Sequence, residues 1–191
     1  MRFGLVGTGF WARTAHATAL AQVPGISLAA VWGRNPQAAA SLAADFGATA
    51  YRDVGAFIDA VDAVAFAVPP DVQAPIAIQA AEAGKHLLLE KPIATSTAEA
   101  DKMAAAAESA GATGNSLFVW GEAGRSAMPA TQVDAVPALR TAASELAAAA
   151  AAGRSRHPCD VQFGRDVVRV LAAAQAQVDA VRPGLDDPPR L

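Results

Sequence analysis

Cysteine is nearly absent from this chain of 191 residues, since Cys159 is the only one. A single cysteine excludes an intrachain disulfide and fits a reducing compartment. Runs of basic residues are also absent, and the net charge is −3 with a pI near 5.5. We therefore expect no nucleic-acid partner, because proteins that bind nucleic acid present clustered positive charge.

Long hydrophobic runs are missing as well. The alanine segment 147–152 is far too short to cross a membrane. The apolar start, RFGLV, is similar to a short signal peptide, but Gly7 and Gly9 interrupt it and no separate hydrophobic region follows. These absences predict a cytoplasmic protein with no membrane partner. With the signal peptide excluded, residues 2–6 are predicted to form a buried strand.

The chain instead contains an alternation of short apolar runs with segments of helical spacing. Nearly continuous apolar runs, typical of strands covered on both faces, occur at 2–6, 26–32, 62–68 and 86–89, with a weaker run at 49–51. Helical patterns alternate with them at 13–22, 36–46, 53–60, 71–83 and 96–110. This alternation predicts an α/β fold: a doubly wound, mostly parallel Rossmann sheet with helices on both faces.

The C-terminal part departs from this rhythm. Glycine, asparagine and serine break the helical pattern after residue 110, and a strand-like run follows at 117–120. An alanine-rich helix is predicted over 133–152, where Pro137 fits only in the first turn, and an amphipathic helix over 161–178. We expect 117–120 to pair at the edge of the sheet and the two extra C-terminal helices to pack on it.

The segment GTGFWA, residues 7–12, lies between the first expected strand and the first expected helix. In a dinucleotide-binding fold the first glycine of such a G-x-G-x-x-A pattern makes the turn, and the second lets the backbone approach the pyrophosphate. The phosphates then face the N–H groups at the start of the helix. The alternative is a glycine turn in an unrelated α/β domain. The motif predicts cofactor-binding residues Gly7, Thr8, Gly9, Phe10 and Trp11.

The end of the second expected strand indicates which dinucleotide would bind. An acidic residue there would hold the ribose 2′-hydroxyl of NAD. The sequence there is instead Gly33-Arg34-Asn35, and Arg34 is placed to meet a 2′-phosphate through a charge-assisted hydrogen bond. We predict that these three residues bind the cofactor and that NADP is favoured, with NAD possible; the alternative is an exposed loop arginine without a ligand.

A charged pair, Glu90-Lys91, follows the expected strand 86–89 and precedes Pro92. Ligands of doubly wound sheets bind at the carboxyl ends of the strands, so we interpret these three residues as part of the same site. The alternative is an ordinary salt bridge between Glu90 and a neighbour at the end of a strand.

The stretches GLVGTGFWA and AVPPDVQAPIAIQAAEAGKHLLLEKP, with the helix after them, resemble the glucose–fructose oxidoreductase/inositol dehydrogenase/rhizopine catabolism (Gfo/Idh/MocA) family. The resemblance covers roughly residues 1–112. It implies that Lys91 is catalytic, lying beside the nicotinamide and the substrate hydroxyl, and that the Lys91–Pro92 bond is a candidate for the cis form. A histidine is frequent in the family where Gln73 stands. The resemblance adds Val68, Pro69, Pro70 and Gln73 to the cofactor-binding residues.

Members of this family carry a second α/β domain that supplies most of the substrate pocket and an acid–base histidine. The three histidines of this chain, at positions 16, 86 and 157, lie in no comparable segment. The resemblance therefore implies a member that lacks most of the substrate domain, and the surface left open could drive formation of a homo-oligomer. The domains expected are an NAD(P)-binding Rossmann domain at 1–120, a remnant of the C-terminal domain at 121–180 and a disordered tail at 181–191.

Three functions are considered, and we predict the first, because GTGFWA and Glu90-Lys91-Pro92 are both present. The first is an NAD(P)-dependent oxidoreductase that transfers hydride between the nicotinamide and a hydroxyl or carbonyl of a sugar, cyclitol or other polyol-like small molecule. The second is a non-catalytic dinucleotide-binding module, which the missing histidine favours. The third is a subunit whose exposed face completes the site of another chain. No metal site is expected.

Overall fold

The computed structural model describes residues 1–111, 114–116, 135–154 and 159–181. Its centre is a six-stranded sheet with the order β3-β2-β1-β4-β5-β6, in which every pair of neighbours is parallel. The strands are β1 (Arg2–Val6), β2 (Ser27–Trp32), β3 (Thr49–Tyr51), β4 (Ala63–Phe66), β5 (His86–Leu89) and β6 (Gly114–Ser116). The predicted doubly wound α/β fold is confirmed.

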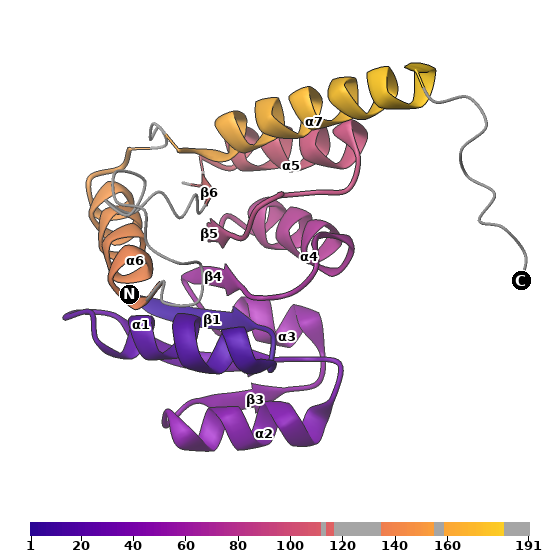
Figure 1. The fold of residues 1–191 in the computed structure, drawn as a ribbon. Coiled ribbons are helices and arrows are strands. Elements are labelled where there is room, and N and C mark those ends of the chain that lie inside the picture. Colours follow the sequence, from indigo (N-terminus) through magenta and orange to yellow (C-terminus); the bar gives the residue numbers. More distant parts are fainter. Residues whose placement is uncertain (112–113, 117–134, 155–158, 182–191) are drawn as a thin grey trace, which may run out of the picture.

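Helices cover both faces of this sheet (Figure 1). The chain order is η1 (Ala12–Ala17), α1 (Thr18–Ala21), α2 (Pro36–Asp45), α3 (Val54–Asp59), α4 (Pro70–Glu82), α5 (Thr97–Ser109), α6 (Val136–Ala151) and α7 (Val161–Val181). One apolar cluster joins η1, α1, α2 and α6 to one face of the sheet, and a second joins α3, α4, α5 and α7 to the other. The strands are therefore buried on both faces, as their unbroken apolar sequences require.

Side-chain caps explain where several helices begin. The side-chain oxygens of Asn35, Asp53 and Ser96 accept backbone N–H groups in the first turns of α2, α3 and α5. Pro137 is the second residue of α6, so its missing N–H costs no helical hydrogen bond, as the sequence predicted.

The first helix differs from the regular α-helix expected over 13–22. Residues Ala12–Ala17 form a π-helix, and only Thr18–Ala21 return to the α form. The hydroxyl of Thr18 donates to the carbonyl of Arg13, five residues back, at 3.0 Å. A π-helix bonds residues five apart instead of four, so it changes which side chains share a face.

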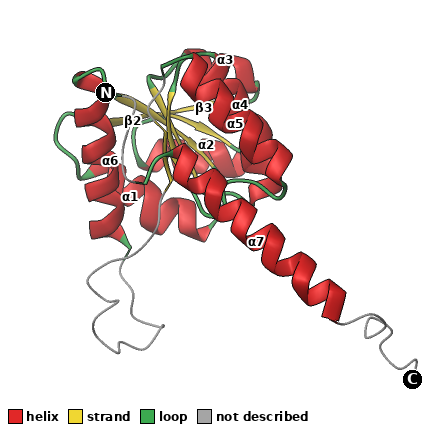
Figure 2. Ribbon diagram, turned by 90° about the horizontal axis from the view of Figure 1, so that it is seen from above, coloured by secondary structure: helices red, strands yellow, loops and turns green. Residues whose placement is uncertain are grey.

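The two C-terminal helices cover different parts of the domain. Helix α6 contributes Ala143 and Leu146 to the cluster that contains Leu88 of β5. Helix α7 packs its first half on α5, with Val161 and Val168 buried, and its second half extends away from the domain (Figure 2). The packing predicted for these helices is confirmed, although α7 is buried only in part.

Two other expectations lie outside the described residues. The strand predicted at 117–120 is one, and the tail beyond residue 181 is the other. The edge strand that the structure does show is β6, which pairs with β5 immediately before 117–120. Within the described part of the chain, no helix is both long and apolar enough to span a membrane.

Candidate dinucleotide site

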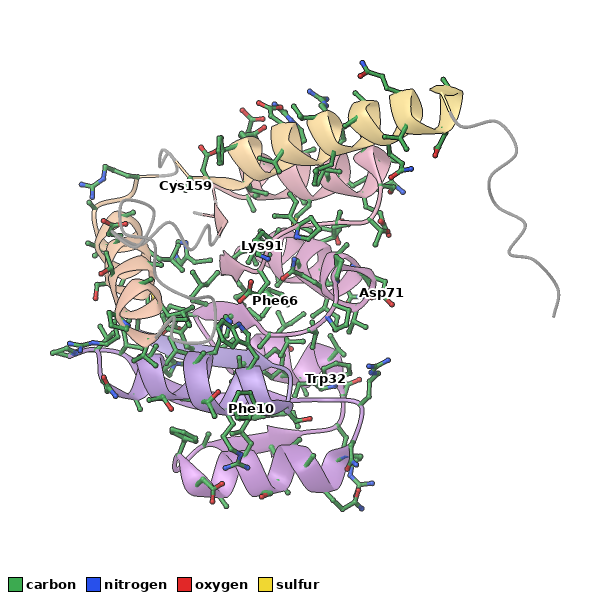
Figure 3. All side chains as sticks on the ribbon, in the orientation of Figure 1. Phe10, Trp32, Phe66, Asp71, Lys91 and Cys159 are labelled. Atoms are coloured by element: carbon green, nitrogen blue, oxygen red, sulfur yellow. The ribbon has the colours of Figure 1, made fainter. Side chains whose placement is uncertain are left out.

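The predicted cofactor residues lie in four loops that leave the carboxyl ends of four strands, or in the first turns of the helices that follow. They follow β1, β2, β4 and β5, and because all these strands are parallel the loops meet at one edge of the sheet. The strand order reverses between β1 and β4, which is where a doubly wound sheet opens a crevice for its ligand. Figure 3 shows Lys91 at the end of β5 and Phe10 at the start of the helix after β1.

Gly7 and Gly9 serve different purposes in the turn after β1. Gly7 has a φ of +130°, and a Cβ there would lie 2.5 Å from the carbonyl oxygen of Ala67, so only glycine lets this turn pass the loop after β4. A Cβ on Gly9 would meet nothing within 4 Å. The space above Gly9 is therefore open, which is what a close approach of a phosphate to the backbone needs.

The helix start after this turn offers free backbone donors. The carbonyl of Gly9 accepts the N–H of Arg13 at 3.1 Å, so the helical hydrogen bonds begin there. The amides just before Arg13 belong to the group that a helix start leaves without partners inside the helix. Donors at the positive end of a helix suit a pyrophosphate, and with the open space at Gly9 they fit the predicted group.

The loop after β2 packs directly against the glycine turn. A Cβ on Gly33 would lie 2.6 Å from Cγ2 of Thr8, so Gly33 lets the two loops touch. Arg34 is exposed beside it, whereas the side-chain oxygen of Asn35 accepts the N–H groups of residues 37 and 38 as a helix cap. A hollow of about 260 Å³ lies next to this loop, lined by Pro36, Gln37, Ala40, Ala50, Tyr51 and Arg52.

The side chain of Gln73 forms hydrogen bonds with the backbone of the turn after β5. Its side chain is fully buried in α4, and its amide nitrogen donates to the carbonyls of Glu90 at 2.8 Å and Ile93 at 3.1 Å. Its amide oxygen accepts the N–H of Glu90 at 2.9 Å. The Lys91–Pro92 bond between these anchors is cis, as expected, and Lys91 is exposed. Gln73 therefore positions the turn, while its predicted contact with the cofactor stays a prediction.

The carboxylate of Glu90 links this turn to the first helix. Its Oε1 accepts the indole N–H of Trp11 at 2.8 Å and lies 2.9 Å from Nε2 of His16. Burial alone would raise the pKa of Glu90, but the hydrogen bonds from His16 and Trp11 outweigh it and leave that pKa below its ordinary value. Glu90 therefore has two side-chain partners, both from the first helix, and its predicted place in the cofactor site stays a prediction.

Comparison with known proteins decides the family. A profile of the oxidoreductase family with an NAD-binding Rossmann fold, Gfo/Idh/MocA, matches residues 1–117. The chain belongs to this family. The resemblance found in the sequence is thereby confirmed for the Rossmann domain.

Individual Gfo/Idh/MocA relatives match a little more than half of the chain. Glucose-6-phosphate 3-dehydrogenase of Bacillus subtilis is 38% identical over 107 residues, which cover 56% of this chain and 30% of that protein. A 3-ketoreductase from Actinomadura kijaniata in complex with NADP matches with a TM-score of 0.58 at 29% identity, over 62% of this chain and 38% of that one. GenD2 of gentamicin A biosynthesis in complex with NAD gives a TM-score of 0.56 at 34% identity, over 59% and 33%. The chain spans about a third of the length of these relatives.

The two histidines in the described part of the chain occupy different settings. His16 is 1% exposed, and among the described residues its Nδ1 has no hydrogen-bond partner. His86 is half-buried in β5, and burial lowers its pKa against an opposing effect of Asp62. His157 lies outside the described residues. The contact between His16 and Glu90 was not predicted, because a regular helix would not turn His16 and Trp11 to the same partner.

Proposed function

We propose that this chain is an NADP-preferring oxidoreductase of the Gfo/Idh/MocA type that acts on a sugar- or polyol-like small molecule. The observation that carries this proposal is the meeting of the open glycine turn with the turn of Lys91, joined by the hydrogen bond between Trp11 and Glu90. The pyrophosphate in the middle of a dinucleotide would lie on the glycine turn, and Lys91 would lie beside its nicotinamide end. Family membership and the NADP and NAD complexes of two matched structures support it.

Each residue of the site would have a distinct task. The backbone donors after Gly9 would hold the pyrophosphate, and Arg34 would bind a 2′-phosphate as an exposed cation at the end of β2. A bound nicotinamide would supply the hydride chemistry. The amine of Lys91, a cation with three donors, would orient the substrate oxygen at the reacting carbon and stabilise negative charge there.

The choice of substrate rests on the relatives. Glucose-6-phosphate 3-dehydrogenase and UDP-N-acetylglucosamine 3-dehydrogenase, which is 37% identical over 103 residues, are both named for oxidation of a sugar at carbon 3. A hydroxyl on a sugar or cyclitol ring is therefore the substrate group we assign to Lys91. The pocket walls would come from residues beyond the Rossmann domain, from another domain or from another copy of the chain.

Fluorescence titration with NADPH and NADH tests the proposal. We expect the parent chain to bind both and to prefer NADPH, and Arg34→Ala to remove at least about tenfold of that preference. Arg52→Ala serves as the matched control, since this second arginine lines the hollow but does not follow β2 directly. Lys91→Ala should retain binding and lose oxidation of a panel of sugars and cyclitols.

Each alternative predicts a different result. Failure of the parent to bind either nucleotide at millimolar concentration contradicts the proposal. An unchanged preference in Arg34→Ala contradicts the assignment of NADP. Binding without turnover of any compound in the panel would favour the non-catalytic dinucleotide-binding module.

A further inference from the structure

One oxygen of Glu90 receives two side chains of the first helix. Trp11 and His16 are five residues apart, and both contact Oε1 of Glu90, at 2.8 and 2.9 Å. In an α-helix of 3.6 residues per turn, side chains five apart point in directions about 140° apart. They could not both reach one oxygen atom from that geometry.

The π-helix removes this difficulty. Ala12–Ala17 are π-helical, and the hydrogen bonds of a π-helix connect residues five apart, so residues with that spacing share a face. The segment that departs from α geometry is thus the one that lies between Trp11 and His16. Its effect is to bring both donors to the carboxylate at the end of β5.

The two donors come from opposite surroundings. Trp11 is 40% exposed at the glycine turn, whereas His16 is 1% exposed in the core. A carboxylate can only accept a hydrogen bond, so Nε2 of His16 is the donor to Glu90. The backbone N–H of Lys91 also interacts with the Glu90 carboxylate.

We propose that Trp11, Glu90 and His16 form a positioning triad that fixes the turn of Lys91 relative to the glycine turn. Gln73 fixes the same turn from the side of α4, so the backbone on either side of Lys91 is held by two helices. The triad keeps a constant spacing between the phosphate end of the site and the amine. The effect of the triad on catalysis rests on the proposed function, whereas the contacts that form the triad do not.

Nuclear magnetic resonance of the ligand-free, ¹⁵N-labelled chain tests the triad. The indole N–H signal of Trp11 should shift as Glu90 is protonated in acid, because its acceptor is that carboxylate. The indole of Trp32, which donates to the carbonyl of Arg52, is the internal control. Glu90→Gln should abolish the shift, and His16→Leu should move its midpoint to higher pH, because burial of Glu90 is then opposed by one donor fewer.

Hydrogen exchange at the amide of Lys91 provides the second measurement. Trp11→Phe and His16→Leu should each speed it about tenfold, the effect of losing one hydrogen bond to a charged group. His16→Gln, which retains an N–H donor, should restore most of the protection, and Trp32→Phe should leave it unchanged. If His16 only filled space, His16→Leu and His16→Gln would protect the amide of Lys91 equally well.

The outcomes separate this inference from the proposed function. The triad is overturned, even if NADPH binds, by two results together: an indole signal of Trp11 that does not shift in acid, and hydrogen exchange at the Lys91 amide that is unchanged in Trp11→Phe. A parent chain that binds neither nucleotide refutes the proposed function and leaves the triad measurements valid. If His16→Leu does not fold, Trp11→Phe and Glu90→Gln still decide the question, because Trp11 is partly exposed and glutamine retains an acceptor.

Discussion

Gly7 and Gly9 are two residues apart in one turn, but the space around their Cα atoms differs. Gly7 faces a backbone oxygen that leaves no room for a methyl group, whereas Gly9 faces open space. The first constraint belongs to folding and is visible in the protein alone. The second has no explanation in the packing of the described residues, and under the proposed function the open space would receive the pyrophosphate.

The same substitution at the two positions separates these roles. Gly7→Ala should lower the free energy of unfolding by about 1–3 kcal/mol or more, because of its positive φ and the contact with Ala67. Gly9→Ala should change it by less than about 0.5 kcal/mol and should weaken NADPH binding, because the methyl group occupies the space of the phosphate. Urea unfolding and fluorescence titration measure the two quantities. Equal loss of stability in both variants would contradict this division.

Gln73 has a structural task that is visible without any ligand. Its amide is fully buried and uses both its donor and its acceptor side on the backbone from Glu90 to Ile93. Burying a side-chain amide is favourable only when its N–H donors and its oxygen are hydrogen-bonded. The position of the Gln73 side chain and the path of the 90–93 turn therefore depend on each other.

At the scale of elements, the sequence predicts best where one periodicity decides the structure. The strands at 2–6 and 86–89 match their predictions because a nearly continuous run of apolar residues is typical of a parallel strand that is buried on both faces. For the first helix, the spacing predicts a helix but not its π-helical turn, because that turn has no periodic signature. Ala12–Ala17 consists of small and polar residues that suit either geometry. The contact of Trp11 and His16 with Glu90 was therefore beyond prediction from spacing alone.

Helix α7 provides a prediction at this scale, because only its first half packs on the domain. Val168 is 4% exposed in the cluster shared with α5, while Val178 is 46% exposed on the projecting half. Val168→Ala should cost about 2 kcal/mol of stability, and Val178→Ala should cost less than about 0.5 kcal/mol. Chemical unfolding of the two variants beside the parent measures the difference. Similar costs would mean that α7 does not dock as described.

The whole molecule combines a complete Rossmann sheet with helices that close part of its surface. Helix α6 covers the sheet beside β5 on one face, and α7 covers α5 on the other. At the carboxyl edge of the sheet, where the glycine turn and Lys91 lie, the loops after the strands form the surface. The domain limits predicted at residues 120 and 180 stay predictions, and so does a homo-oligomer, because they depend on surfaces beyond the described packing.

Acid stability is a property of the whole molecule to which three described groups contribute in the same direction. The hydrogen bond from Arg2 lowers the pKa of Asp62, the donors to Glu90 lower its pKa despite burial, and burial lowers the pKa of His86. For each group the unfolded chain binds the proton more readily than the folded protein. The stability they contribute is thus present above their ordinary pKa and is lost as the pH falls through the folded value.

The free energy of unfolding should therefore fall in two steps as the pH is lowered. The first begins below about 6.5, the ordinary pKa of histidine, and the second below about 4.5, in the range of the carboxyl groups. His86→Phe should remove much of the first step and leave the second, whereas Glu90→Gln should weaken the second and leave the first. Urea unfolding at a series of pH values measures both steps. A stability that rises on acidification between pH 6.5 and 4 would show that the burial of His86 and the pairing of Glu90 do not govern it, because both require the opposite slope.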